Sequence, residues 1–113
     1  MSDSNIRQCI EACLACFVEC ERCSSACIDH GSMAACVKAC RDCADLCHLC
    51  VSFMARGSAL HHELCKLCAA ACQKCAEECG KHAAHHACCK ACEEACRRCA
   101  EACLACGKSS SCC

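Results

Sequence analysis

The sequence predicts an all-α protein, an antiparallel up-down four-helix bundle with a cysteine-lined core. First, 25 of the 113 residues are cysteine, and most of them recur at alternating steps of four and three residues. Such a repeat averages about 3.5 residues, which places one stripe of side chains along an α-helix. Second, the chain contains no proline, so nothing interrupts long helices. Third, glycine and serine separate four such stripes, and links this short make neighbouring helices antiparallel.

The first helix is predicted to start at a cap formed by Asp3 or Ser4 and to run to about Asp29-His30. Gly31 suits the left-handed position that often follows the end of a helix. The thiol stripe of this segment comprises Cys9, Cys13, Cys16, Cys20, Cys23 and Cys27.

The second helix follows Ser32, which suits its N-cap, and runs to about Arg56. Its stripe comprises Cys36, Cys40, Cys43, Cys47 and Cys50. The pair Gly57-Ser58 then repeats the same signals for the end of one helix and the start of the next.

The third helix is predicted to reach about Lys81, with a frayed end near Gly80, and the fourth to run from about Ala83-Ala84 to Gly107. The third stripe comprises Cys65, Cys68, Cys72, Cys75 and Cys79. The fourth comprises Cys89, Cys92, Cys96, Cys99, Cys103 and Cys106, with Cys88 one step off the stripe.

Length and composition predict one domain over residues 1–107, followed by a flexible tail over residues 108–113. Cys112 and Cys113 in this tail lie outside the repeat and receive no role. The balance of 12 basic and 13 acidic residues argues against nucleic acid or an anionic membrane as a partner. No targeting or transmembrane segment is recognisable, so we expect a cytoplasmic protein whose thiols stay reduced.

Two alternative explanations for the cysteines are weaker. A disulfide scaffold needs Cβ atoms about 3.5–4.5 Å apart, whereas helical neighbours at i,i+3 and i,i+4 are about 5–6 Å apart. Free cysteine is also a small hydrophobic residue that is often buried. Leucine would fill a core better, however, so purely structural packing does not explain 22 thiols in the stripes.

Each stripe continues into residues that can also bind metal. The next steps of the repeat reach His30, Met33, Met54, His61, His82 and His85. In an antiparallel bundle, four of these gather at one end, namely His30, Met33, His82 and His85. Met54 and His61 gather at the other end with Cys106. The sequence therefore predicts that all six, together with the stripe cysteines and Cys88, are metal ligands.

Charge favours Cu(I) as the metal. Zn²⁺ bound by four thiolates carries about −2, so five such sites would leave about −10 in a low-dielectric interior. One Cu(I) per thiolate is neutral, and soft thiolate and thioether ligands favour this ion. Two metal–sulfur bonds of about 2.3 Å would span roughly the separation of an i,i+4 pair, so each C-x-x-x-C pair, such as Cys16–Cys20, could hold one ion. A zinc or mixed-metal buffer similar to metallothionein remains the alternative.

A second, weaker stripe of apolar residues lies outside the thiols. It comprises Ile10, Leu14, Phe17 and Val18, then Leu46, Leu49 and Phe53, then Leu60, Leu64 and Leu67. We expect these residues partly to pack between helices and partly to form a homo-oligomer interface.

An enzyme or redox protein has little support, because no acid–base pair, phosphate-binding loop or single distinctive thiol is present. With repeated C-x-x-x-C pairs on four helices and His and Met at the bundle ends, the chain resembles the bacterial copper storage proteins from about Ser4 to Gly107. The resemblance implies a non-enzymatic protein of the cytosolic branch that fills with many Cu(I) ions and assembles as a homotetramer. It also implies copper entry at the end matched by His30, Met33, His82 and His85, with a copper chaperone as a candidate donor.

Overall fold

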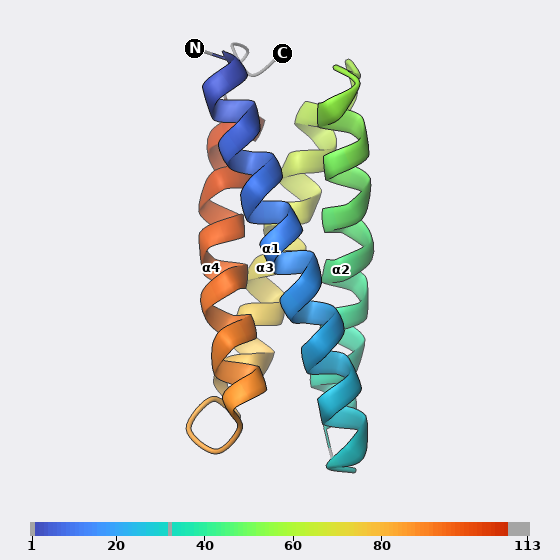
Figure 1. Ribbon diagram of the computed structural model, residues 1–113, viewed down its shortest axis with the longest axis vertical. Coiled ribbons are helices and arrows are strands. Elements are labelled where there is room, and N and C mark those ends of the chain that lie inside the picture. Colours follow the sequence, from blue (N-terminus) through green and yellow to red (C-terminus); the bar gives the residue numbers. More distant parts are fainter. Residues whose placement is uncertain (1, 32, 109–113) are drawn as a thin grey trace.

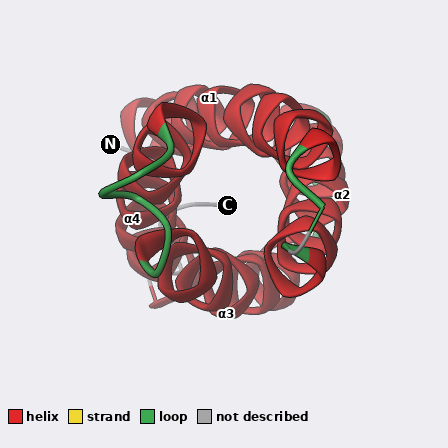
Figure 2. Ribbon diagram, turned by 90° about the horizontal axis from the view of Figure 1, so that it is seen from below, coloured by secondary structure: helices red, strands yellow, loops and turns green. Residues whose placement is uncertain are grey.

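A computed structural model of the chain describes residues 2–31 and 33–108. Over these residues it contains no strand and four helices, α1 (Ser2–Asp29), α2 (Ala34–Ala55), α3 (His61–Gly80) and α4 (Ala87–Lys108). The helices alternate in direction within one bundle that measures 43 × 19 × 17 Å (Figure 1). Both α1 and α3 pack against α2 and α4, so the order of the helices around the bundle follows the chain (Figure 2). The prediction of an all-α antiparallel four-helix bundle is confirmed.

Two glycines end helices as predicted. Gly31 follows α1 with a φ of 84°, and Gly57 follows α2 with a φ of 66°. Residues with a Cβ rarely adopt this left-handed conformation, so glycine suits both turns. Ser32, the predicted cap of α2, lies outside the described residues, and α2 begins after Met33, which makes no side-chain capping bond.

The starts of α1 and α3 differ from the sequence prediction. α1 already begins at Ser2, so Asp3 and Ser4 belong to its first turn rather than preceding it. α3 begins at His61, three residues after Ser58. The Ser58 hydroxyl accepts a hydrogen bond of 3.1 Å from the backbone of Leu60, so this serine stabilises a turn that precedes the helix.

The start of α4 was also predicted wrongly. The expected start at Ala83-Ala84 lies within turns that occupy residues 81–85, and α4 begins at Ala87. Residues 81–86 contain no Ser, Thr, Asp or Asn that could cap a helix. The segment therefore reverses direction through backbone bonds such as that from the amide of His86 to the carbonyl of His82, 3.0 Å long. At the other end α4 includes Lys108, and the rest of the predicted tail, residues 109–113, lies outside the described residues.

Thiols take the place of the usual aliphatic core. Among the described residues, the buried apolar side chains are 22 cysteines, five alanines and the two methionines Met33 and Met54. No Leu, Ile, Val or Phe belongs to this buried set, although several pack around it. The cysteine-lined core is therefore confirmed, and it is continuous from one end of the bundle to the other.

Small residues next to the thiols let the helices approach closely. Ala44 on α2, Ala69 and Ala76 on α3, and Ala95 and Ala100 on α4 are each buried beside a cysteine of the core. On α1 the corresponding small residue is Ser24, which is 4% exposed and whose hydroxyl donates to the carbonyl of Glu21. A larger side chain at these positions would separate the helices and hence the thiols.

The outer apolar stripe divides into two groups. Ile10, Phe17, Leu46 and Leu64 are partly buried against the thiol core, as expected for packing between helices. A second group remains largely exposed, comprising Leu14, Val18, Leu49, Leu60 and Leu67, together with Ile28.

Within the described part of the chain, no helix is both long and apolar enough to cross a membrane.

Candidate metal centre

The four helices bring the 22 stripe cysteines into one buried column. Each of these side chains is at most 1% exposed, because the repeat of about 3.5 residues keeps every stripe facing the bundle axis. Cys88 is only partly buried, in agreement with its position off the stripe. All 23 described cysteines are free thiols. Their neighbouring sulfur atoms are 3.4 Å or more apart, well beyond the roughly 2.05 Å of a disulfide.

Several of the expected C-x-x-x-C pairs are close within one helix. The Sγ atoms are 3.7 to 3.9 Å apart in Cys16–Cys20, Cys23–Cys27, Cys75–Cys79, Cys92–Cys96 and Cys99–Cys103. An ion bound between two such sulfurs would need them to move about 1 Å farther apart, because two metal–sulfur bonds in line span about 4.6 Å.

Thiols on different helices approach each other just as closely. The Sγ atoms are separated by 3.4 Å between Cys36 and Cys79, and by 3.5 Å between Cys43 and Cys72. Cys16 reaches Cys43 on α2 at 3.6 Å and Cys96 on α4 at 3.6 Å. The column is therefore a connected network rather than a set of independent pairs on single helices.

Groups of four thiols within this network could each hold a metal ion. In one group each helix contributes one residue, namely Cys13, Cys50, Cys68 and Cys103, and the four sulfur atoms all lie within 4.8 Å of one another. A second group combines Cys13 and Cys68 with Cys47 and Cys99. Because the two groups share Cys13 and Cys68, ions bound in both would be bridged by common thiolates. The arrangement suits clusters of metal ions.

Proton affinity differs along the column. Burial raises the pKa of Cys27 to about 12 and also raises the pKa values of Cys36 and Cys89. Nearer the middle, hydrogen bonding lowers the pKa of Cys16 and raises the pKa of its neighbour Cys20, because one thiolate is stabilised by the proton that the adjacent thiol keeps. Many thiolates cannot be buried side by side without cations, so a metal ion that enters must displace protons.

Histidines gather at the bundle end formed by the α1–α2 and α3–α4 turns. The ring centroids of His30 and His86 are 4.5 Å apart, and those of His82 and His86 are 6.3 Å apart. His30 and His85 are exposed, whereas His82 and His86 are half-buried. Partial burial and the three nearby imidazoles lower the pKa of His86 below its ordinary value, so this ring favours the neutral, metal-binding form.

Two of these positions modify the sequence prediction. His86 did not lie on an extended stripe and was missed, although its spacing of four residues from His82 was a usable signal. Met33 is at this end as predicted, but it is 4% exposed and lines a separate hollow with Cys27 between α1 and α2.

The opposite end contains a buried group of three different ligand types. The thiol of Cys65 donates to the Sδ atom of Met54 at 3.9 Å. His61 lies one helical turn before Cys65 and is 1% exposed. Its Nδ1 atom lies 2.9 Å from the carbonyl oxygen of Ser58, and so donates to it, while its buried Nε2 atom has no hydrogen-bond partner. A buried, unpartnered nitrogen one helical turn from a thiol that is itself bonded to a thioether is well suited to a soft metal ion.

The remaining predicted ligand of this end is also buried. Cys106 is 1% exposed, and its thiol points to the carbonyl oxygen of Asn5 on α1 at 3.8 Å. The carbonyl oxygen of Cys106 lies 3.0 Å from Nδ1 of His62, whose ring stacks on that of His61. Cys112 and Cys113 lie outside the described residues.

Comparison with known proteins relates this architecture to a family. Residues 2–108 match the copper storage protein family. The apo form of copper storage protein 3 from Bacillus subtilis is 42% identical and has a TM-score of 0.83, with 89% of this chain and 97% of that chain covered.

Two metal-containing structures are similar as well. The Cu(I)-bound copper storage protein BsCsp3 is 39% identical with a TM-score of 0.83, over 89% of this chain and 96% of that chain. A cytosolic copper storage protein from Streptomyces lividans, with five coppers, is 30% identical with a TM-score of 0.91, over 96% of both chains. Together with the match over almost the whole sequence, these similarities show that the chain belongs to the copper storage protein family.

Proposed function

We propose that this protein stores Cu(I), binding many ions through the cysteine thiolates of its core and so protecting the cell from free copper. The observation that carries the proposal is the column of 22 buried thiols, which is connected across all four helices. No Leu, Ile, Val or Phe of the described residues is buried with it. A catalytic protein would need only a few of these thiols. A column of thiols through the whole bundle instead gives the protein a large capacity for Cu(I) ions. We therefore assign it a role in copper binding rather than in catalysis.

Charge balance supports Cu(I) as the cargo. The interior contains no buried Lys or Arg among the described residues, so nothing within it would neutralise an excess of thiolate charge. One Cu(I) for each thiolate leaves the column close to neutral, whereas four-thiolate zinc sites would each leave about −2. Shared thiolates such as Cys13 and Cys68 would allow neighbouring ions to form clusters.

At both ends of the column, histidine and methionine side chains add to the cysteine ligands. At one end His30, Met33, His82 and His85 are proposed ligands, and the position of His86 adds a fifth candidate. Exposed imidazoles next to the core suit the capture of ions from outside, so we place copper entry here. At the other end Met54 and His61 complete the terminal site with Cys65 and Cys106.

The whole bundle, residues 1–107, acts as a single copper-binding domain in this proposal. We place it in the cytoplasm, where thiols are kept reduced. The similarity to a cytosolic storage protein of Streptomyces lividans supports this location. A soluble copper chaperone would be a suitable donor.

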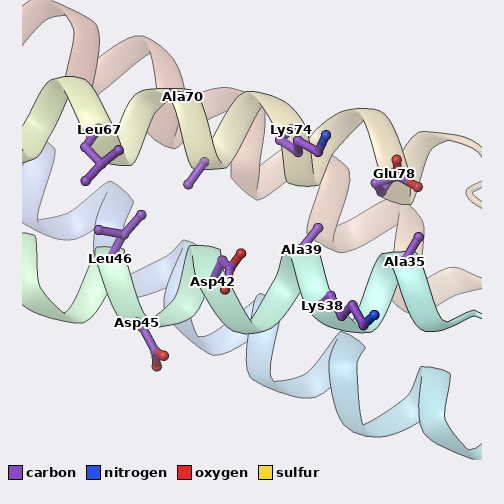
Figure 3. Close-up of a pocket in the computed structure, with 11 residues that line it drawn as sticks. Ala35, Lys38, Ala39, Asp42, Asp45, Leu46, Leu67, Ala70, Lys74 and Glu78 are labelled. Carbon is purple, nitrogen blue, oxygen red and sulfur yellow. The ribbon is translucent and has the colours of Figure 1, made fainter.

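We also propose that the protein is a homo-oligomer, a tetramer in keeping with the family. A shallow groove between α2 and α3 is lined by alanines with Leu46 and Leu67 at one end, and charged residues flank it (Figure 3). On α2, Lys38 and Asp45 are seven residues apart, so a two-fold axis between them would pair each with its opposite charge on a second copy. The exposed side chain of Leu67 would then be covered.

Anaerobic titration of the reduced, metal-free protein with Cu(I) tests the storage proposal, with Zn²⁺ titrated in parallel. We expect binding of about one Cu(I) per stripe cysteine, in competition with a chelator, because Cu(I) alone fills the column without excess charge. Saturation at a few Cu(I) ions, or tighter binding of Zn²⁺ at a few discrete sites, would contradict bulk storage.

A further inference from the structure

A groove on the surface leads to the buried end that lies opposite the histidine cluster. Ile6, Arg7, Ile10 and Glu11 of α1 line one side of it, and residues 54–57 at the end of α2 line the other. Its volume is about 750 Å³, within the range of small-molecule sites. The groove is therefore large enough for a thiol of the size of a short peptide.

Met54 connects this groove with the thiol column. It lines the groove although its side chain is only 3% exposed. Its sulfur accepts a hydrogen bond from Cys65 behind it, and the Cys65 side chain is fully buried. Among the described residues that line the groove, Met54 alone carries a soft ligand atom. A metal ion could thus pass from the column to the groove through one thioether.

Cys65 continues the connection inward. Its thiol interacts with the thiols of Cys103, Cys50 and Cys9. Cys103 in turn lies 3.7 Å from both Cys9 and Cys13. Soft ligands therefore follow one another without a gap from the groove into the middle of the bundle.

The charges around the groove favour an anion. Arg7 and Arg56 flank it and Glu11 is its only acidic residue among those described, so its local charge is about +1. Arg56 is held in place by its stacking on Phe53, with 4.6 Å from the guanidinium carbon to the ring centroid, and by a bond to the carbonyl of Ser52. The groove thus combines a positive rim with half-buried apolar walls from Ile6 and Ile10.

The two ends of the bundle differ in chemistry. The histidine end has exposed imidazoles. At the other end the ligands are buried, and only the thioether of Met54 separates them from the positively charged groove. We propose that this groove is a second mouth of the copper store, at which a small anionic thiol of the glutathione type removes Cu(I) from Met54 and Cys65. This inference rests on the proposed storage function and adds an exit route and an acceptor class to it.

The transfer is a ligand exchange without redox change. The sulfur of the incoming thiol bonds to Cu(I) while the bonds from Cu(I) to Met54 and Cys65 break. The proton of the incoming thiol moves to the Cys65 thiolate, and copper keeps its +1 charge throughout. Met54 stays neutral and unprotonated, so it can hold the ion transiently while Cys65 is released.

The variant Met54→Leu tests this route, and the reverse exchange Leu49→Met, at an exposed position on the same helix that does not line the groove, is the control. Leucine and methionine have similar volumes, so both variants should fold. The proteins are loaded fully with Cu(I), and copper release to excess glutathione is followed by transfer to a coloured chelator. We expect Met54→Leu to slow release several-fold and Leu49→Met to leave the rate unchanged.

The variant Arg7→Glu tests the acceptor class. It should slow release to glutathione by roughly tenfold, because it turns an attractive rim into a repulsive one, but leave release to neutral 2-mercaptoethanol unchanged. Equal release rates for wild type, Met54→Leu and Arg7→Glu would overturn the proposed exit, as would equal slowing by Leu49→Met. The Cu(I) capacity of each protein is measured first. A low capacity in the wild type would refute storage itself, whereas full capacity with equal release rates would refute only this exit.

Discussion

The sulfur atom of Cys99 is surrounded by thiols from several helices. It lies 3.6 Å from Cys13 on α1, 3.8 Å from Cys47 on α2 and 3.9 Å from Cys103 on its own helix. Any ion bound here would share its ligands with neighbouring ions. The loss of one sulfur should therefore be compensated by the others.

We predict that Cys99→Ser lowers the Cu(I) capacity by only about one ion and leaves the bundle folded. Serine is nearly isosteric, and its hydroxyl can bond to a carbonyl one turn earlier, so the metal-free protein should lose about 1–2 kcal/mol of stability. Capacity is measured by anaerobic titration and stability by thermal unfolding. Cys88→Ser, which removes a half-exposed thiol off the stripe, is the control and should leave stability within about 0.5 kcal/mol. Loss of all copper binding in Cys99→Ser would contradict a distributed core.

At the residue scale, the positions of the 22 buried thiols could be predicted from the sequence alone. The spacing of four and three residues determines which side of a helix each cysteine occupies, and tertiary packing does not change it. The contact between His86 and His30 could not be predicted in this way. The two rings meet because the chain reverses over residues 81–86, and the path of that turn follows from no repeat in the sequence.

At the scale of the elements, the sequence predicted pairs of thiols along one helix, and the bundle adds pairs between helices. A stripe specifies the direction in which thiols point but not the axial offset between neighbouring helices. That offset depends on packing at small residues such as Ala44 and Ala69, and it brings Cys43 within 3.5 Å of Cys72. The stripe pattern also does not determine where a helix begins. α4 begins only at Ala87, because the residues just before it include no side chain that could cap an earlier start.

We predict that the homo-oligomer forms through the outer face of α2 and α3. Leu67 is 56% exposed next to the alanine-lined groove, and an aspartate there would place a charge within the proposed contact with a second copy. We predict that Leu67→Asp shifts the protein to a smaller species in analytical ultracentrifugation. The folded monomer should be preserved, because the side chain lies outside the core.

Leu14→Asp provides the comparison for this experiment. Leu14 is exposed to a similar degree, 47%, but it lies on α1, outside the groove. This variant should keep the wild-type oligomer. If Leu14→Asp dissociates the oligomer and Leu67→Asp does not, the interface lies on α1 instead of on the α2–α3 face.

On the scale of the whole molecule, the fold buries many thiols together, and no Lys or Arg of the described residues is buried among them to neutralise their ionised forms. Burial raises the pKa of Cys27 to about 12 and raises the pKa values of Cys36 and Cys89 as well. These thiols lie near the histidine end, on three different helices. The protonated state of the metal-free core is therefore coupled to the stability of the entire bundle.

This coupling predicts how stability depends on pH. In the unfolded chain Cys27 ionises near its ordinary pKa of 9.0, whereas in the folded chain it keeps its proton up to about 12. Its contribution to folding is fully present below about pH 9 and is lost as the pH rises through about 12. We expect the Tm of the reduced, metal-free protein, followed by circular dichroism, to fall over this range. In the Cu(I)-loaded protein the thiols have already lost their protons to the metal, so its Tm should change much less. A metal-free protein whose Tm stayed level or rose over the same range would show that burial does not hold these thiols in the protonated form.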